Sequence, residues 1–245
     1  MAALLQLTGL RKRYGALAVT DGVDLEVVPG EAVGVIGPNG AGKSTLFNLI
    51  TGDVRPDAGV VRLAGQDITG LAPHARARLG IGRSYQIPQP FGRMSVYENV
   101  LVGALFAGRG RSPNAGRHCA EVLERTGLIG KADLPAGRLT LLDRKRLELS
   151  RALAVSPRLL LLDEIAGGLT EAESVALVDT IRAIQAATGA AILWIEHVLH
   201  ALVPVVSRLV VLSFGRKLAE GAPREVLDSP AVRETYLGLG DEDAA

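Results

Sequence analysis

The sequence predicts an α/β fold in which a parallel strand-helix core is interrupted by an all-helical insertion. Short apolar runs such as VGVIG and RLLLLDE have the length and composition of buried strands, and helical patterns follow them. From residue 95 to residue 155 the pattern is helical instead. The 245 residues supply ample material for a core. We therefore expect one domain over residues 1–245, with residues 1–94 and 156–245 as the α/β core and residues 95–155 as a helical subdomain.

The N-terminal third is rich in strand patterns. We expect strands at LLQLTGL, VDLEVV and AVGVIG, with Pro29-Gly30 as the turn between the last two. A helical pattern, KSTLFNLI, begins after Gly42 and stops near Gly52. Further along, VVRLAG and GQDI predict a small strand pair, PHARARLG a short helix, and IGRSY another strand.

The rest of the chain is expected to be helical first and then to alternate between strands and helices. SVYENVLVGALF and RHCAEVLERTGL have apolar faces at helical spacing and are separated by the loop GRGRSPNAG. Buried strands are predicted at RLLLLDE, AAILWIEH and RLVVLSFG, and a long helix at EAESVALVDTIRAIQAATG. EVLDS and AVRETYLG predict short helices, and GDEDAA a frayed acidic end.

Composition argues against several classes of protein. The formal net charge is only +1, so the basic footprint of a nucleic-acid-binding protein is missing. The single cysteine, Cys119, rules out an internal disulfide framework and predicts a small packed side chain on a helix. The N-terminus lacks the pattern of a signal peptide, and no apolar run approaches the roughly 18 residues that span a bilayer. We therefore expect any membrane role to come through a partner.

GPNGAGKST, residues 37–45, matches the phosphate-loop pattern, with a buried strand before it and a helix after it. Glycines let backbone N–H groups turn toward phosphate oxygens, and the helix N-terminus adds a positive dipole end. The lysine supplies a charge for the β- and γ-phosphates, and the serine offers a hydroxyl to Mg²⁺. The alternative, a glycine-rich turn without a nucleotide, does not account for the lysine, the hydroxyl and both flanks. The candidate nucleotide-binding residues are Gly37, Asn39, Gly40, Gly42, Lys43, Ser44 and Thr45.

Polar groups follow three other predicted strands. Asp163 ends RLLLLDE and is our candidate Mg²⁺ ligand, while the adjacent Glu164 is the candidate for orienting or deprotonating the attacking water. The plainer interpretation is a pair of acids ending a strand. His197 follows AAILWIE, where a core strand would deliver a polar group to the same cleft, although a lone histidine is usually satisfied by a neighbour or solvent. Gln86 follows IGRSY, and spacing alone does not distinguish it from a polar turn residue.

Taken in order, GPNGAGKST, Gln86, LLLLDE and His197 resemble the ATP-binding subunit of ABC transporters over nearly the whole chain. The stretch from VRPDAGVVRLAGQDITGLAPHARARLGIGRSYQIPQP to FGRMSVYENVLVGA is similar, more narrowly, to the branched-chain amino acid importer group, as is EHVLHALVPVVSRLVVLSFGRKLAEGAPREV. The resemblance implies a P-loop NTPase core with an N-terminal antiparallel β subdomain and an inserted helical subdomain. It also implies an ATPase that uses ATP and Mg²⁺.

The resemblance assigns further roles. Tyr14 would stack on adenine, Gln86 would sense Mg²⁺ and the γ-phosphate, and His197 would contact the γ-phosphate. For Tyr14 a plain surface tyrosine is the alternative. Phe91 and Met94 would lie near the groove for a permease coupling helix, and core packing is an equally good interpretation of both.

The implied partners are integral membrane permease subunits and a second ATP-binding subunit, with a heterodimer expected and a homodimer as the alternative. An extracytoplasmic solute-binding protein would act indirectly, and no nucleic acid is expected. The chain would lie at the cytoplasmic face of the inner membrane and energise uptake of branched-chain amino acids or a related small polar solute. The competing functions are a soluble ABC-type ATPase and a regulatory nucleotide-binding module. A GTPase is disfavoured, because no Asn-Lys-x-Asp motif is present.

One segment departs from the family pattern. Where the family has serine, two glycines and glutamine facing a neighbour's ATP, this chain has Thr140, Leu141, Leu142 and Asp143, within the LTLLD segment (residues 139–143). Thr140 keeps a hydroxyl and is the candidate contact to that nucleotide, but without glycines close backbone approach to a phosphate is less favourable. Thr140-x-x-Asp143 also approximates a capping box that starts a helix whether or not ATP is near. The following basic run, residues 144–146, would either offset the aspartate or form a solvated face.

Overall fold

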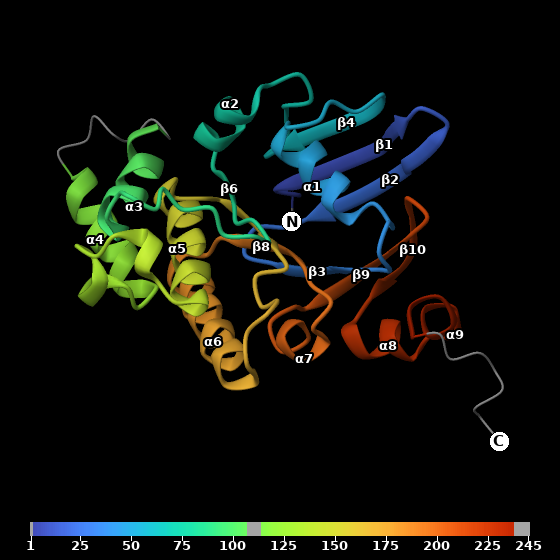
Figure 1. Cartoon of the computed structure of the whole chain (residues 1–245). Coiled ribbons are helices and arrows are strands. Elements are labelled where there is room, and N and C mark those ends of the chain that lie inside the picture. The colour runs from blue at the N-terminus through green and yellow to red at the C-terminus, as the bar shows by residue number, and fades with distance from the viewer. Residues whose placement is uncertain (1, 107–113, 238–245) are drawn as a thin grey trace. The chain divides into compact units, whose positions relative to one another are not determined.

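The computed structural model describes residues 2–106 and 114–237 (Figure 1). The chain divides into two compact units: unit 1 comprises the residues up to Leu71 and from Leu193 onward, and unit 2 comprises Ala72–Ile192. The boundary falls within strand β8 (Ala191–Ile195). Most of the predicted loop GRGRSPNAG and the whole of the predicted tail GDEDAA lie outside the described residues. Each unit is described below by itself.

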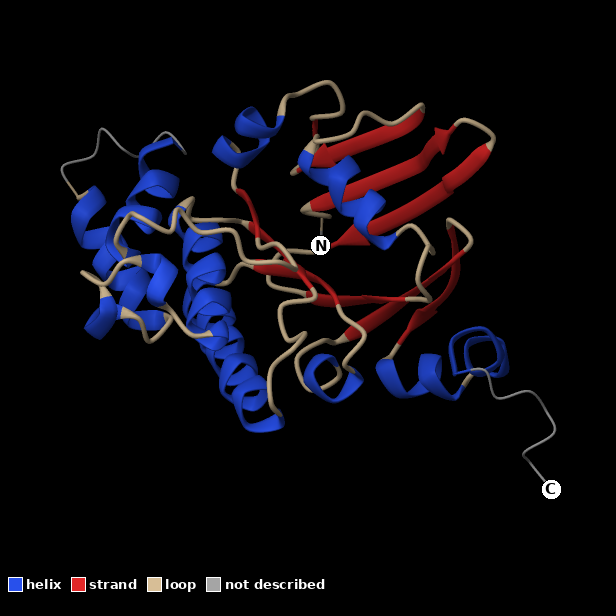
Figure 2. Ribbon diagram, viewed as in Figure 1, coloured by secondary structure: helices blue, strands red, loops and turns tan. Residues whose placement is uncertain are grey.

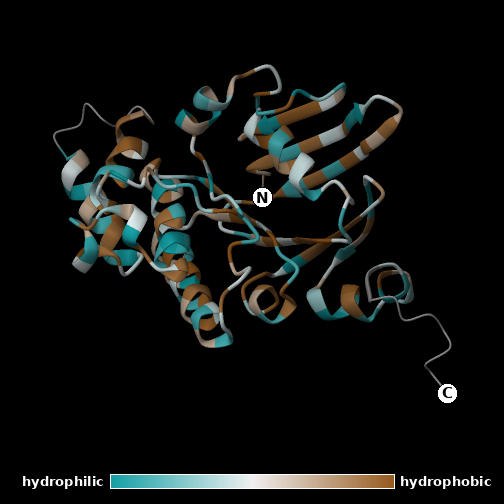
Figure 3. Cartoon of the chain, viewed as in Figure 1, coloured by the Kyte–Doolittle hydropathy of each residue, from teal (hydrophilic) through white to brown (hydrophobic). Residues whose placement is uncertain are grey.

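Unit 1 contains a four-stranded antiparallel sheet with the strand order β2-β1-β4-β5 (Figure 2). Buried and exposed residues alternate along much of β1, and Figure 3 shows hydrophobic and hydrophilic residues interspersed along these strands. The two long strands run past the predicted apolar segments, because the pairing continues through polar residues to a tight hairpin at Tyr14↔Leu17. The strands are β1 (Leu5–Tyr14), β2 (Leu17–Val27), β4 (Ala58–Leu63) and β5 (Gln66–Asp67).

The second set of strands in unit 1 surrounds β3 (Ala32–Ile36), which is buried throughout and pairs in parallel with β9 (Arg208–Ser213). Strand β10 (Arg216–Gly221) adds to β9 in the antiparallel sense. The apolar pattern did not predict β10, because half of its residues are charged, most are exposed, and only the ladder with β9 makes them a strand. Helix α1 (Lys43–Thr51) ends at Gly52, as predicted, and Gly52 has the left-handed conformation that is common at helix ends.

Short helices complete unit 1. Helix α7 (Leu199–Leu202) packs on β3, since a Cβ atom on Gly34 would lie 3.0 Å from the Leu202 side chain. The predicted helical character after β10 is confirmed, as α8 (Pro223–Asp228), α9 (Pro230–Val232) and the π-helix η4 (Arg233–Leu237).

Unit 2 holds two parallel strands, β6 (Ile81–Arg83) and β7 (Leu159–Asp163), together with a group of helices. Helices α3 and α6 both begin with capping boxes, Ser95 with Glu98 and Thr170 with Glu173, which satisfy backbone groups at the helix start. Helix α3 packs against both α4 and α5. The helices are α2 (Pro73–Arg78), α3 (Val96–Ala104), α4 (Ala115–Arg125), η2 (Ile129–Lys131), η3 (Ala136–Arg138), α5 (Leu141–Ala154) and α6 (Glu171–Thr188).

Cys119 is fully buried on α4, which confirms the predicted packing role. Burial raises the pKa of the thiol above its ordinary value, because the charged thiolate loses solvation. The side chain therefore behaves as a small apolar group rather than as a nucleophile.

Candidate functional site

The phosphate loop of unit 1 runs from the end of β3 at Ile36 to the start of α1 at Lys43. Its shape requires glycine at two positions. A Cβ atom on Gly37 would lie 2.2 Å from the Leu212 backbone oxygen, and one on Gly42 would lie 2.3 Å from the Val19 backbone oxygen. Gly42 also has φ +98°, a conformation that other residues rarely adopt. The loop therefore packs directly against neighbouring backbone, and a side chain at Gly37 or Gly42 would clash with that backbone.

Lys43 lies across this loop and is buried. Its Nζ donates to the Gly37 carbonyl at 2.7 Å and to the Pro38 carbonyl at 3.0 Å. Ser44 is exposed on the first turn of α1, which contains no acidic residue, and Thr45 is half-buried beside it. A positively charged lysine, a helix N-terminus and an available hydroxyl form an arrangement that suits an anionic phosphate, and the hydroxyl is a hard oxygen ligand of the kind Mg²⁺ prefers. Asn39 and Gly40 are exposed at the tip of the loop.

Two further predicted residues belong to unit 1. Tyr14, at the end of β1, is 51% exposed, with the Lys12 ammonium 5.6 Å from the ring centre. The exposed ring is compatible with stacking on a base and with a plain surface position, so the role of Tyr14 stays a prediction.

His197 follows β8, and its backbone neighbour Glu196 donates its N–H to the Val35 carbonyl at 3.4 Å. The end of β8 therefore lies beside the end of β3, close to where the phosphate loop begins. The imidazole is largely exposed, with Nδ1 3.6 Å from a Glu196 carboxylate oxygen. Glu196 is fully buried and also accepts from Trp194 Nε1 at 3.3 Å. Glu196 was not among the predicted site residues, although an acid at the end of an apolar strand was a signal for it.

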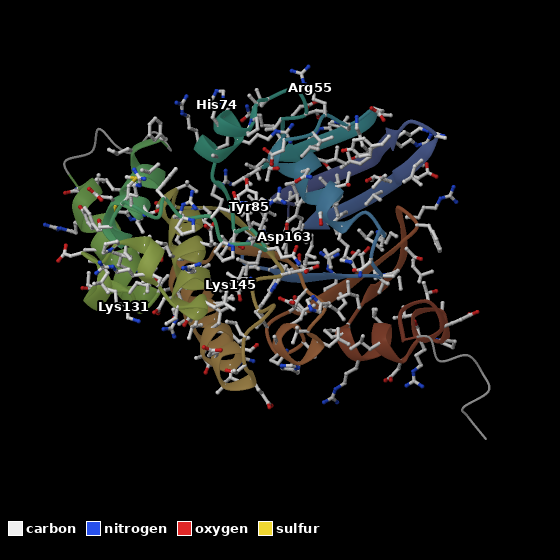
Figure 4. All side chains as sticks on the ribbon, viewed as in Figure 1. Arg55, His74, Tyr85, Lys131, Lys145 and Asp163 are labelled. Atoms are coloured by element: carbon white, nitrogen blue, oxygen red, sulfur yellow. The ribbon has the colours of Figure 1, made fainter. Side chains whose placement is uncertain are left out.

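In unit 2, Asp163 ends β7 and is buried. Its Oδ2 lies 2.9 Å from the guanidinium of Arg83, the last residue of the parallel strand β6. Arg83 was not among the predicted site residues, although its position at the end of a strand was the available signal. Figure 4 labels Asp163 at this strand end. The arginine offsets the cost of burying the carboxylate, and the role of Asp163 as a Mg²⁺ ligand stays a prediction.

Glu164 occupies a constrained position. Its backbone has φ +43°, which is uncommon for a residue with a side chain. Its carboxylate accepts a hydrogen bond from Gln86 Nε2, contributed from 78 residues earlier in the chain. Unit 2 therefore brings together the predicted water-orienting carboxylate and the predicted sensing glutamine.

The LTLLD segment starts α5 as the capping-box interpretation predicted. Thr140 is the N-cap and accepts from the Asp143 backbone N–H at 3.3 Å, while its hydroxyl donates to Asp143 Oδ2 at 3.0 Å. The Asp143 carboxylate is buried and forms an ion pair with Lys131. Thr140 and Leu141 are exposed at the start of the helix.

The interpretation of the basic run after this segment as a solvated face is wrong, and an offset of the Asp143 charge by that run stays a prediction. Lys131, from η2, neutralises Asp143, and only the tertiary fold makes it a neighbour. Lys145 is 2% exposed, so it does not belong to a solvated face. Arg144 donates instead to the carbonyls of Leu139 and Gly137, each at 3.0 Å.

The core-packing alternative for Phe91 is also wrong, because its side chain is 46% exposed. The guanidinium of Arg151 lies 5.2 Å from the ring centre. Met94 is half-buried. An exposed ring on a loop is available to a partner. A position of Phe91 near the groove for a permease coupling helix therefore stays a prediction.

A hollow of about 640 Å³ in unit 1 is separate from the phosphate loop. Its charged groups are already paired: Arg208 binds Glu31 at 2.8 Å and also pairs with Glu220. Burial raises the pKa of Glu31, but the hydrogen bonds from Arg208 and the Val28 amide, together with the charge of Arg208, lower it by more, which keeps the carboxylate charged. This network stabilises the junction of β9 and β10 rather than forming a catalytic centre.

The chain matches known proteins along almost its whole length. Residues 20–167 match the family model described as ABC transporter, and residues 216–242 match one described as branched-chain amino acid ATP-binding cassette transporter. The high-affinity branched-chain amino acid transport ATP-binding protein LivG of Escherichia coli is 36% identical, covering 96% of this chain and 98% of that protein. The lipopolysaccharide export system ATP-binding protein LptB of Acidithiobacillus ferridurans is 38% identical, covering 97% and 98%.

The structural comparison agrees. The crystal structure of the ADP conformation of an ATP-binding cassette of an ABC transporter has a TM-score of 0.88 and 32% identity, covering 98% of this chain and all of that one. The chain therefore belongs to the ABC transporter family and is an ATP-binding cassette ATPase with a P-loop NTPase fold. None of the helices within residues 2–106 and 114–237 has the length and apolar character needed to cross a membrane.

Proposed function

We propose that this ATPase energises an ABC importer for branched-chain amino acids or a related small polar solute. The observation that carries the solute class is the match of residues 216–242 to the branched-chain amino acid cassette model, beside the full-length likeness to LivG. The similar likeness to LptB shows that overall identity alone does not separate import of amino acids from other transport. A soluble ATPase without a transport role is the alternative that the experiment below distinguishes.

The site residues take the following roles in this proposal. The backbone of the phosphate loop and Lys43 bind the phosphates, while Ser44 and Asp163 hold Mg²⁺, which would neutralise phosphate charge when bound. Tyr14 stacks on the adenine. The remaining loop contacts come from Gly37, Asn39, Gly40, Gly42 and Thr45, and Thr140 faces the nucleotide of the second ATP-binding subunit.

Hydrolysis depends on three side chains. Glu164 orients the attacking water and accepts its proton, which makes the oxygen a better nucleophile. Gln86, already hydrogen-bonded to Glu164, holds that carboxylate in place until Mg²⁺ and the γ-phosphate are present. His197 donates to the γ-phosphate, and its exposed imidazole has the freedom to do so.

The partners in this proposal are permease subunits in the inner membrane and a second ATP-binding subunit that supplies the segment facing this chain's phosphate loop. A solute-binding protein acts through the permease. The exposed Phe91 and half-buried Met94 contribute to the permease-facing surface. The chain would therefore work at the cytoplasmic face of the membrane, held there by the permease.

The proposed function is tested with the whole transporter reconstituted in vesicles. Leucine, isoleucine or valine, delivered with the solute-binding protein, is expected to stimulate ATP hydrolysis severalfold and to accumulate inside the vesicles. Urea, an amide and a short carboxylate serve as comparison solutes. Stimulation by one of those alone would replace the amino acid assignment, and failure of the chain to associate with any permease would reject transport.

The LTLLD segment is expected to support hydrolysis at the neighbouring subunit's site less well than a glycine-containing segment. The double change Leu141→Gly and Leu142→Gly allows closer backbone approach to a phosphate and should raise turnover at that site severalfold. The measurement is ATPase activity of a transporter whose other site is inactivated. The single change Leu134→Gly, at an exposed leucine outside the segment, is the matched control. Unchanged turnover from an already high wild-type rate would show that the leucines are an adequate variant.

A further inference from the structure

Lys145 is a buried lysine near the start of α5 (Leu141–Ala154). Its Nζ donates to the Gln86 backbone carbonyl at 2.6 Å and to the Glu164 backbone carbonyl at 3.3 Å. Burying an ammonium group is costly unless hydrogen bonds replace the lost water. Two of its three donors are therefore accounted for by the backbones of the two residues that the proposed function uses for hydrolysis.

These contacts close a ring of hydrogen bonds. Lys145 joins the main chains of Gln86 and Glu164, and the Gln86 side chain donates to the Glu164 carboxylate. The ring therefore fixes both the backbone and the side chain of each residue. The Glu164 backbone has φ +43°, a strained conformation for a residue with a side chain, and such a conformation persists only where surrounding contacts hold it.

The same face of α5 holds the Gln86 loop (residues 84–90) at a second point. Glu148 accepts from the Gln89 backbone N–H at 3.1 Å, and Arg151 donates to the Gln89 carbonyl at 3.0 Å. Glu148 and Arg151 are themselves paired at 2.7 Å. Lys145, Glu148 and Arg151 follow one another at intervals of three residues, which places them on one side of the helix.

We propose that Lys145 is a positioning residue for hydrolysis: it holds Gln86 and Glu164 in mutual register and links both to the helix that begins at the LTLLD segment. The inference rests on the proposed roles of Gln86 and Glu164. The Lys145 ammonium group, carried by α5, bonds to both Gln86 and Glu164. A displacement of α5 would therefore move both residues through this one side chain. Figure 4 labels Lys145 on this helix.

The test compares Lys145→Met, which keeps most of the length and volume but removes the donors, with Lys145→Arg, which keeps a cation and its donors. In the assembled transporter Lys145→Met should lower kcat about 10- to 100-fold, since a misplacement of about 1 Å can cost that much. The dissociation constant for a fluorescent ATP analogue should change less than about twofold, because the lysine binds no phosphate in this assignment. Lys145→Arg should recover a large part of kcat. Arg182→Gln, which removes an exposed cation on α6, is the control.

A second measurement does not depend on turnover. Hydrogen–deuterium exchange of peptides covering residues 84–90 and 162–168 should be faster in Lys145→Met than in wild type, and restored in Lys145→Arg. Unchanged exchange and unchanged kcat in Lys145→Met would overturn the inference. A wild-type chain that hydrolyses no ATP in any assembly would count against the proposed function, while the exchange result would still decide whether Lys145 holds the two segments.

Discussion

Glu164→Gln is expected to reduce ATP turnover by the assembled transporter about 100- to 10,000-fold, which is the range that a general base contributes. The amide keeps the shape of the carboxylate and an oxygen to accept the Gln86 hydrogen bond, but it does not accept a proton from water. The change therefore removes proton acceptance with little disturbance of unit 2. Turnover is measured by phosphate release, and nucleotide affinity by titration with a fluorescent ATP analogue.

Nucleotide affinity should be preserved in Glu164→Gln, because Lys43 and the phosphate loop are unchanged. Glu171→Gln removes an exposed acid from the first turn of α6 and is the matched control, expected to keep wild-type turnover. Wild-type turnover in Glu164→Gln would reject Glu164 as the residue that accepts the proton. It would also mean that this chain's own site does not carry the measured turnover.

Lys43→Met is expected to weaken ATP binding about 100-fold or more. Charge-assisted hydrogen bonds contribute about 1.5–3 kcal/mol each, and two lost phosphate contacts correspond to at least that factor. Lys43 also donates to the carbonyls of Gly37 and Pro38, so the variant leaves these loop groups without that donor. Isothermal titration with an ATP analogue that is not hydrolysed measures the affinity directly.

Lys217→Met removes a lysine of the same unit that is ion-paired with Glu220 on β10, and should bind nucleotide as tightly as wild type. Circular dichroism of both variants would show whether the fold is retained. If Lys43→Met bound ATP with wild-type affinity, the phosphate-loop assignment would be wrong, since no other predicted residue supplies a positive charge to the phosphates.

The parts of the fold that the sequence predicted have strong local signals. The phosphate loop lies between an apolar β-branched run and a helix that stops at a glycine, and the structure shows β3, α1 and Gly52 in those places. The signal for Thr140 as an N-cap was also local, because a cap depends on residues three apart in the chain. Strand β10 lacked such a signal, since its polar residues form a strand only by pairing with β9.

The sequence by itself determined the class of protein, because phosphate binding needs a short contiguous loop whose glycines, lysine and serine are visible in the printed order. Only the tertiary structure decided which charges meet. Asp143 is neutralised by Lys131, Asp163 by Arg83, and the carbonyls of Gln86 and Glu164 are joined by Lys145. The partners in these contacts lie from 12 to 80 residues apart, and buried charges are stable only where folding brings a partner to them. The sequence identified Asp143, Asp163 and Glu164. Lys131, Arg83 and Lys145 became their neighbours only through the fold.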